Sequence, residues 1–138
     1  IHAGIIPGIH LLEQDLWLCC MMRNIIIDGD QMIGTHKPDI GNPWINYYFG
    51  PQHIIFGHDA KRELQFGKYA TGIDTGCCYG RKLTAMIVKF DENDNLIREN
   101  DEHLYETQNW ENNADKYVSE SGLCFSIIQV DGLKQSKL

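Results

Sequence analysis

The stretch that decides the fold is "FGHDAKRELQFGKYATGIDTGCCYG", residues 56–80. It holds the ends of two short apolar runs, "HIIFGHDA" (53–60) and "YATGIDTG" (69–76), and each run leads into a glycine turn that carries a histidine or an aspartate. A strand that ends in such a turn presents its last side chains over a sheet edge, where layered α/β proteins build their sites. The stretch therefore predicts a mixed α/β chain with a site near His58 or Asp74.

The triplet Asp74-Thr75-Gly76 permits a second interpretation, because aspartic proteases present their catalytic carboxylate in an Asp-Thr-Gly turn. With one such triplet in the chain, Asp74 would have to pair with its copy across a symmetric dimer, and the two carboxylates would share a proton. This hypothesis also needs a glycine-rich flap, which the sequence does not offer convincingly. A three-residue signal is weak, so the retroviral-type protease remains the lesser alternative.

Composition indicates a globular chain of one modest domain. The chain has 138 residues, 43% of them hydrophobic and 22% charged, and a net charge of −7. Residues 91–120 hold ten acidic and two basic side chains, which predicts a solvated acidic face. Strong nonspecific binding to nucleic acid is not expected, since it needs clustered lysine and arginine. No apolar run approaches the length that spans a bilayer, so we expect no membrane partner and a cytoplasmic location.

The five cysteines do not have the spacing of a zinc site or of a redox pair. Cys19-Cys20 and Cys77-Cys78 are adjacent, and Cys124 stands alone. Zinc and thioredoxin-like motifs place two residues between the paired cysteines. We therefore expect free thiols in a reducing compartment.

Hydrophobic periodicity and turn residues predict the other elements. We expect a helix within residues 11–24, with Leu12, Leu16, Cys19 and Cys20 on one face. Further expectations are a loop over residues 28–43, an aromatic helix or turn over 44–50, a strand over 82–90 buried on both faces, a polar region with a short helix over 101–119, and a last strand over 123–130.

Two histidines stand out by their context. His2 in "IHAG" and His58 in "FGHDA" both follow apolar residues and lie beside a glycine. At the ends of neighbouring strands they could converge on one metal ion, because neutral imidazole is the commonest metal ligand in proteins. Taken alone, each histidine is more often an ordinary loop or core residue than a metal ligand.

Four segments taken together carry a resemblance to a known family. These are "IHAGIIPGI", "MMRN", "NPWINYYFGPQHIIFGHDAKRELQ" and "YATGIDTGCCYGRKLTAMIV", which lie in this order between about residues 1 and 90. They resemble the C-terminal half of a calcineurin-like metallophosphoesterase. More narrowly, they are similar to ApaH-like phosphatases, relatives of the symmetrical diadenosine tetraphosphatase and of the Ser/Thr protein phosphatases.

The resemblance implies a fold, a reaction and a set of residues. The fold is a double β-sandwich flanked by helices, with two divalent ions (manganese, iron or zinc) at the sheet edge. A metal-bridging hydroxide attacks phosphorus in line in this family. His2 and His58 match two metal ligands, and Lys61, Arg62 and Tyr79 are candidate substrate contacts that could equally be surface or packing residues. In this interpretation Asp74, Thr75 and Gly76 form a structural turn.

The same resemblance implies that part of the site is not in these residues. The family's Asp-x-His, Gly-Asp-x-x-Asp-Arg and Gly-Asn-His-Glu motifs precede "HAG" and are absent from the sequence. We therefore expect residues 1–100 to be the C-terminal half of a phosphoesterase domain, and residues 101–138 a C-terminal extension. This chain alone should be an inefficient phosphatase, whereas its parent would act on phosphate esters or anhydrides. A non-catalytic, phosphoesterase-like scaffold subunit is the main alternative.

The substrate stays open at this point. The expected partner is a phosphorylated small molecule, a nucleotide or capped RNA end, or a phosphoprotein. Because residues 1–90 are close to neutral, we expect the metal ions to supply most of the attraction for phosphate.

Overall fold

The computed structural model describes residues 1–88, 115–119 and 121–132. The chain divides into two compact units, Ile1–Asp74 (unit 1) and Thr75–Leu138 (unit 2). The predicted boundary between residues 100 and 101 lies outside the described residues and stays a prediction, as does most of the acidic face. No helix in the described part is both long and apolar enough to cross a membrane.

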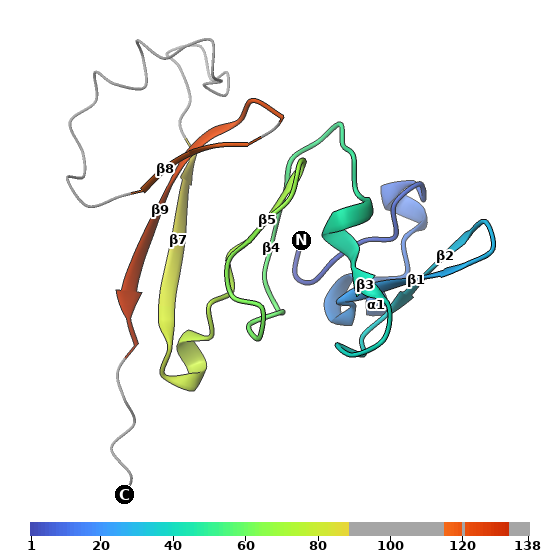
Figure 1. Ribbon diagram of the computed structural model, residues 1–138, viewed down its shortest axis with the longest axis horizontal. Helices are drawn as coiled ribbons and strands as arrows, with labels where there is room; N and C mark the ends of the chain where they lie inside the picture. Colours follow the sequence, from blue (N-terminus) through green and yellow to red (C-terminus); the bar gives the residue numbers. More distant parts are fainter. Residues whose placement is uncertain (89–114, 120, 133–138) are drawn as a thin grey trace, which may run out of the picture. The chain divides into compact units, whose positions relative to one another are not determined.

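The first sheet of unit 1 is antiparallel, with the strand order β2-β1-β3 (Figure 1). β1 (Asn24–Asp28) and β2 (Gln31–Thr35) form a hairpin whose ends pair at Asp28 and Gln31, and β3 (Asn42–Pro43) pairs with the start of β1. Gly29 takes the positive φ (58°) that this tight turn requires. The expectation of a loop over 28–43 was therefore wrong for β2 and β3, since pairing with β1 makes both segments extended.

The predicted helix within residues 11–24 is two shorter elements, η1 (Leu11–Glu13), a 3-10 turn, and α1 (Leu16–Met21). The extended backbone of Gln14 ends the first turn, and Asp15 begins α1, because its carboxylate accepts from the amides of Trp17 and Leu18. The predicted apolar face was also wrong. Leu12 and Leu16 are 91% and 81% exposed.

The second sheet of unit 1 contains the two apolar runs of the deciding stretch. β4 (Ile54–Phe56) lies parallel to β6 (Ala70–Gly72), and β5 (Gln65–Phe66) pairs antiparallel with β6. η2 (Trp44–Tyr47) precedes this sheet. Both runs are thus strands that lead into turns, as predicted, and the mixed α/β class is confirmed.

The core of unit 1 is built around the indole of Trp44, which is 2% exposed. Its Nε1–H donates to the carbonyl of Ala3 at 3.1 Å, and its ring meets Phe56 edge-on with centroids 4.9 Å apart. Gly4 lies so close that a Cβ there would be 2.6 Å from Nε1. Only glycine therefore allows the segment around Ala3 to cross the core against the indole. The buried cluster consists of Ile5, Met22, Ile25, Trp44, Ile45, Tyr48, Phe56 and Ala70.

Unit 2 is an antiparallel sheet with the order β7-β9-β8, preceded by the 3-10 turn η3 (Cys77–Tyr79) (Figure 1). Its strands are β7 (Lys82–Val88), β8 (Asp115–Val118) and β9 (Cys124–Asp131). The strands expected over 82–90 and 123–130 are confirmed within the described residues. Burial of β7 on both faces was wrong, because β7 is an edge strand and Leu83 is 55% exposed. β8 is a strand at the end of the polar region 101–119, where a short helix was expected, and residues 101–114 lie outside the described part.

Replacing Gly4 by alanine should destabilise unit 1. The new Cβ would overlap the buried indole of Trp44, and overpacking of this kind costs about 1–3 kcal/mol. The matched control is Gly57→Ala, whose Cβ would meet no atom nearer than 3.6 Å. Urea unfolding of both variants measures the difference, and equal stability of the two would contradict this account of the core.

The stability of unit 1 should fall in mild acid through His53. Burial lowers the pKa of His53 below its ordinary 6.5, and its Nε2 lies 2.9 Å from Thr71 Oγ1. The folded state therefore binds fewer protons than the unfolded state, so the contribution is full above about pH 6.5 and is lost as pH falls through the folded pKa. We expect His53→Gln to reduce the loss of unfolding free energy between about pH 7.5 and 5. An unchanged pH dependence would be evidence against this role.

Candidate functional site

His2 and His58, which are far apart in sequence, lie together in unit 1. Their ring centroids are 5.1 Å apart with an angle of 56° between the ring planes. Two backbone hydrogen bonds bring them there, from the Ile1 nitrogen to Ile55 O (3.0 Å) and from Gly57 N–H to His2 O (2.8 Å). The first residues thus run beside β4, and the two imidazoles meet at the end of that strand.

His58 occupies a strained backbone position. Its φ is +67°, which is uncommon for a residue with a side chain. The amide of Asp59 donates to Gly57 O at 2.8 Å, so His58 is the central residue of a three-residue γ-turn. Strained positions of this kind persist only where surrounding contacts hold them, and they are concentrated at functional sites.

The imidazole of His58 is prepared to act as a neutral acceptor. Nε2 is buried and has no hydrogen-bond partner. Burial is the main cause that lowers the pKa of His58 below 6.5, and the positive charge of Arg23 and the neighbouring His2 lower it further. A hydrogen bond to the Met21 backbone acts in the opposite direction. The site therefore presents an unpaired, uncharged nitrogen beside a second imidazole.

This arrangement fits part of a metal centre. A buried nitrogen without a partner is unfavourable by itself, and a divalent ion would satisfy it, with the backbone bond orienting the ring as second-shell partners do. In the part of the chain that the structure describes, no group of three or more His, Cys, Asp or Glu side chains gathers to hold a metal. His2 and His58 thus form an incomplete donor set for the three or four ligands that zinc sites have.

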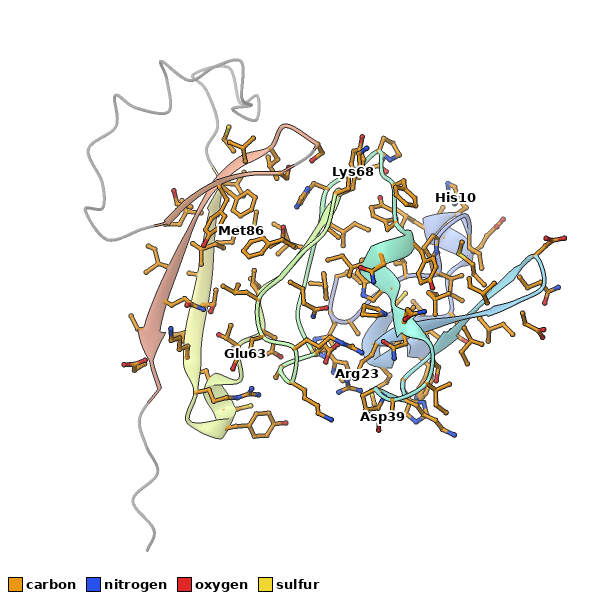
Figure 2. All side chains as sticks on the ribbon, viewed as in Figure 1. His10, Arg23, Asp39, Glu63, Lys68 and Met86 are labelled. Carbon is orange, nitrogen blue, oxygen red and sulfur yellow. The ribbon has the colours of Figure 1, made fainter. Side chains whose placement is uncertain are left out.

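Arg23 is close to this site, although the sequence analysis assigned it no role. It precedes β1, is labelled in Figure 2, and its charge is near enough to lower the pKa of His58. Its Nε lies 3.6 Å from Asp59 Oδ1, and one Nη donates to His36 O at 3.1 Å. The segment "MMRN" contributes to the resemblance, but only the tertiary structure shows that its arginine lies near enough to act on His58.

The three predicted substrate contacts have different surroundings. Lys61 is exposed. Arg62 is half-buried and bonds to Asp59, Asn24 Oδ1 (2.9 Å) and Pro38 O (3.2 Å). Tyr79 belongs to unit 2, is 74% exposed, and has the guanidinium of Arg81 5.9 Å from its ring centroid. Substrate contact by these residues stays a prediction.

Thr75 and Gly76 have the geometry of a structural turn. The buried Thr75 hydroxyl donates to Lys82 O at 2.7 Å and lies 2.5 Å from Thr84 Oγ1. Gly76 has φ of +74°, and a Cβ there would be 2.5 Å from the guanidinium of Arg81. These contacts are compatible with the predicted turn of Asp74, Thr75 and Gly76, which stays a prediction.

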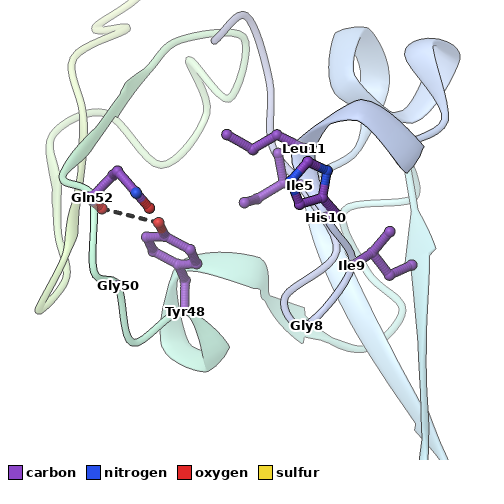
Figure 3. Close-up of a pocket in the computed structure, with 8 residues that line it drawn as sticks. All are labelled: Ile5, Gly8, Ile9, His10, Leu11, Tyr48, Gly50 and Gln52. Atoms are coloured by element: carbon purple, nitrogen blue, oxygen red, sulfur yellow. Dashed lines mark hydrogen bonds between the residues drawn. The ribbon is translucent and has the colours of Figure 1, made fainter.

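A cavity of about 410 Å³ lies elsewhere in unit 1 (Figure 3). Tyr48, whose hydroxyl donates to Gln52 O at 3.0 Å, forms one wall, and His10 lies across from it. Gln52 precedes β4 whereas His58 follows it, and Figure 2 shows His10 at the opposite end of the unit from Arg23. The cavity is therefore not the histidine site. Its lining residues are Ile5, Gly8, Ile9, His10, Leu11, Tyr48, Gly50 and Gln52.

Comparison with known proteins identifies similar chains. The asymmetrical bis(5'-nucleosyl)-tetraphosphatase PrpE of Oceanobacillus iheyensis is 41% identical over 87 residues, which is 61% of this chain and 32% of the relative. The PrpE of Bacillus mycoides is 33% identical over 62% of this chain and 33% of its own length. The zinc-dependent endopolyphosphatase of Saccharomyces cerevisiae is 24% identical, over 65% of this chain and 31% of its own length. No family model matches the chain.

The structural comparison agrees with the sequence comparison. A crystal structure assigned to a diadenosine tetraphosphatase has a TM-score of 0.56 and 35% identity, over 70% of this chain and 43% of that one. The resemblance is therefore confirmed, and this chain is similar to the metallophosphoesterases. Two of the relatives reported above are named as bis(5'-nucleosyl)-tetraphosphatases and the third as an endopolyphosphatase, and all three names are those of hydrolases. The chain spans about a third of the length of the curated relatives that it matches.

Thr75→Val should destabilise unit 2, because valine keeps the shape but removes the buried hydroxyl that donates to Lys82 O. Loss of one hydrogen bond of this kind costs about 0.5–1.5 kcal/mol. Thr35→Val is the matched control, since the Thr35 hydroxyl accepts an exposed bond from Lys37. Thermal unfolding measures both, and equal melting temperatures would contradict the structural role.

Proposed function

We propose that this chain supplies the two-histidine part of the metal centre of a phosphoesterase that hydrolyses phosphoanhydride bonds. The observation that carries the proposal is the buried, unpaired Nε2 of His58 beside the ring of His2. The relatives named as dinucleoside tetraphosphatases and as an endopolyphosphatase support this reaction class. A dinucleoside polyphosphate is the substrate that most of these names favour, whereas capped RNA ends and phosphoproteins have no such support.

In this proposal the residues of this chain bind a divalent ion and orient it toward the substrate. His2 and His58 hold a divalent ion, for which the name of the zinc-dependent relative favours zinc, although manganese or iron would suit the same donors. A second ion, as the resemblance implies, would need ligands from beyond these residues. When bound, such ions act as Lewis acids that stabilise the charge developing on the phosphoryl oxygens.

Arg23 is the arginine whose positive charge lowers the pKa of His58, so it lies close to the proposed metal site. Its guanidinium is half-buried and fixed by Asp59 and His36 O, and its charge is felt at His58. A fixed guanidinium matches the geometry of phosphate oxygens. We propose Arg23 as a substrate contact ahead of Lys61 and Arg62, because Lys61 is exposed and Arg62 already bonds to Asp59, Asn24 and Pro38.

The scaffold and protease alternatives do not explain the strained turn at His58 or the pairing of its ring with that of His2. A non-catalytic subunit would have no need of a strained turn that presents an unpaired nitrogen. A protease acting through Asp74 would have no need of the paired imidazoles. Both alternatives would gain support if the histidines proved dispensable.

His58→Ala tests the proposal. We expect the 138-residue chain to hydrolyse diadenosine tetraphosphate no faster than buffer, and a longer protein that contains the chain and supplies further ligands to be active. In that protein His58→Ala should lower kcat/KM by at least about a hundredfold, since the loss of a ligand exceeds the loss of an outer-shell partner.

Two further measurements complete this test. His10→Ala, at the other end of unit 1, is the matched histidine control and should keep the activity. Metal removal by a chelator should abolish hydrolysis, and added Zn²⁺ or Mn²⁺ should restore it. Activity that survives either His58→Ala or metal removal would overturn the proposal.

A further inference from the structure

The strained turn at His58 needs an anchor. With φ at +67°, a histidine in this position is conformationally strained, and surrounding contacts must hold it. Gly57 N–H binds His2 O on the strand side. On the other side the turn ends at Asp59, whose side chain is therefore the next point of attachment.

Asp59 is a buried carboxylate, 5% exposed, that faces two arginines. Its Oδ2 accepts from Arg62, and its Oδ1, which has no hydrogen-bond partner, lies 3.6 Å from Arg23 Nε. A buried carboxylate is tolerated only where it is paired in this manner. Both arginines keep the side chain of Asp59, and with it the end of the turn, in one place.

The arginines are themselves attached to a separate segment. Arg62 donates to Asn24 Oδ1 and to Pro38 O, and Arg23 donates to His36 O. Asn24 is fully buried and donates to three carbonyls of the same segment, those of Lys37, Pro38 and Ile40. The turn at His58 is thus connected through charged groups to the polypeptide that follows β2.

We propose that Asp59 is the positioning residue of this site: its buried ion pairs with Arg62 and Arg23 hold the γ-turn that presents His58 to His2. The importance of the His58 ring position for metal binding rests on the proposed function. The ion pairs of Asp59 and the turn that they hold do not depend on it. Removing the carboxylate charge frees both arginines and lets the turn relax toward negative φ. The His58 ring then moves away from His2, although the β4–β6 sheet remains.

Asp59→Asn in the 138-residue chain is the test, because asparagine keeps the size and removes the charge. In the metal-free protein, NMR should show a nuclear Overhauser effect between the His2 and His58 rings that is several-fold weaker in the variant. In a titration with Zn²⁺ alone, followed by the resonances of both rings, the half-saturating concentration should rise about ten- to a hundredfold. Asp39→Asn, an exposed aspartate in the segment 36–40, is the control of equal charge and should change neither measurement.

A second variant covers the case in which Asp59→Asn does not fold, which the dispersion of its amide spectrum would reveal. Arg62→Lys keeps the positive charge but loses the planar fork that reaches Asp59 and Asn24 together. It should weaken the ring contact and the Zn²⁺ affinity in the same direction and to a smaller extent.

The outcomes separate this inference from the proposed function. If the folded Asp59 and Arg62 variants keep the ring contact and a Zn²⁺ affinity within about twofold of the parent chain, the positioning role is overturned. If the parent chain shows the ring contact but does not bind Zn²⁺, the metal-binding proposal fails, and the metal-free comparison still decides the role of Asp59.

Discussion

The contact between the indole of Trp44 and Gly4 is the constraint on which unit 1 depends. Because no Cβ fits between them, the chain around Ala3 crosses the core in one position, which the bond from Trp44 Nε1 to Ala3 O then fixes. His2 precedes this point by one residue, so its backbone is held against the end of β4. The same indole packs on Phe56, two residues before His58. One buried ring thereby sets the positions of both histidines.

The sequence predicted the components of the site that depend on local pattern. A short apolar run followed by glycine is a strand end, and β4 and β6 confirm this for the deciding stretch. The sequence also contained a signal for the β1–β2 hairpin that was missed. Gly29-Asp30 lies between two apolar runs, and a two-residue loop with glycine at its first position is a typical hairpin turn. The helix within 11–24 was overestimated, since Asp15 also has a strong preference for the position before a helix.

The charged network around Asp59 could not be predicted in the same way. It joins Arg23, Asn24, Asp59 and Arg62, together with carbonyl groups of residues 36–40. Each of these polar residues looks like a solvated surface group in sequence, and only the packing of the hairpin against the end of β4 brings them together. The interpretation of Arg62 as a phosphate contact illustrates the limit, because the sequence shows a cation beside His58 but not the partners that already occupy it.

The energetics of the histidine site bear on the proposed metal binding. A positive φ at His58 and a buried Nε2 without a partner both lower the stability of the folded chain. The Asp59 carboxylate that holds the positive φ is itself buried, and its desolvation is a further cost. A protein that needed only a folded scaffold would be more stable with glycine at this turn. Under the proposed function, an ion that binds Nε2 of His58 would offset both costs, because binding to the folded state alone adds to its stability. The stability of unit 1 would then depend on the concentration of that ion.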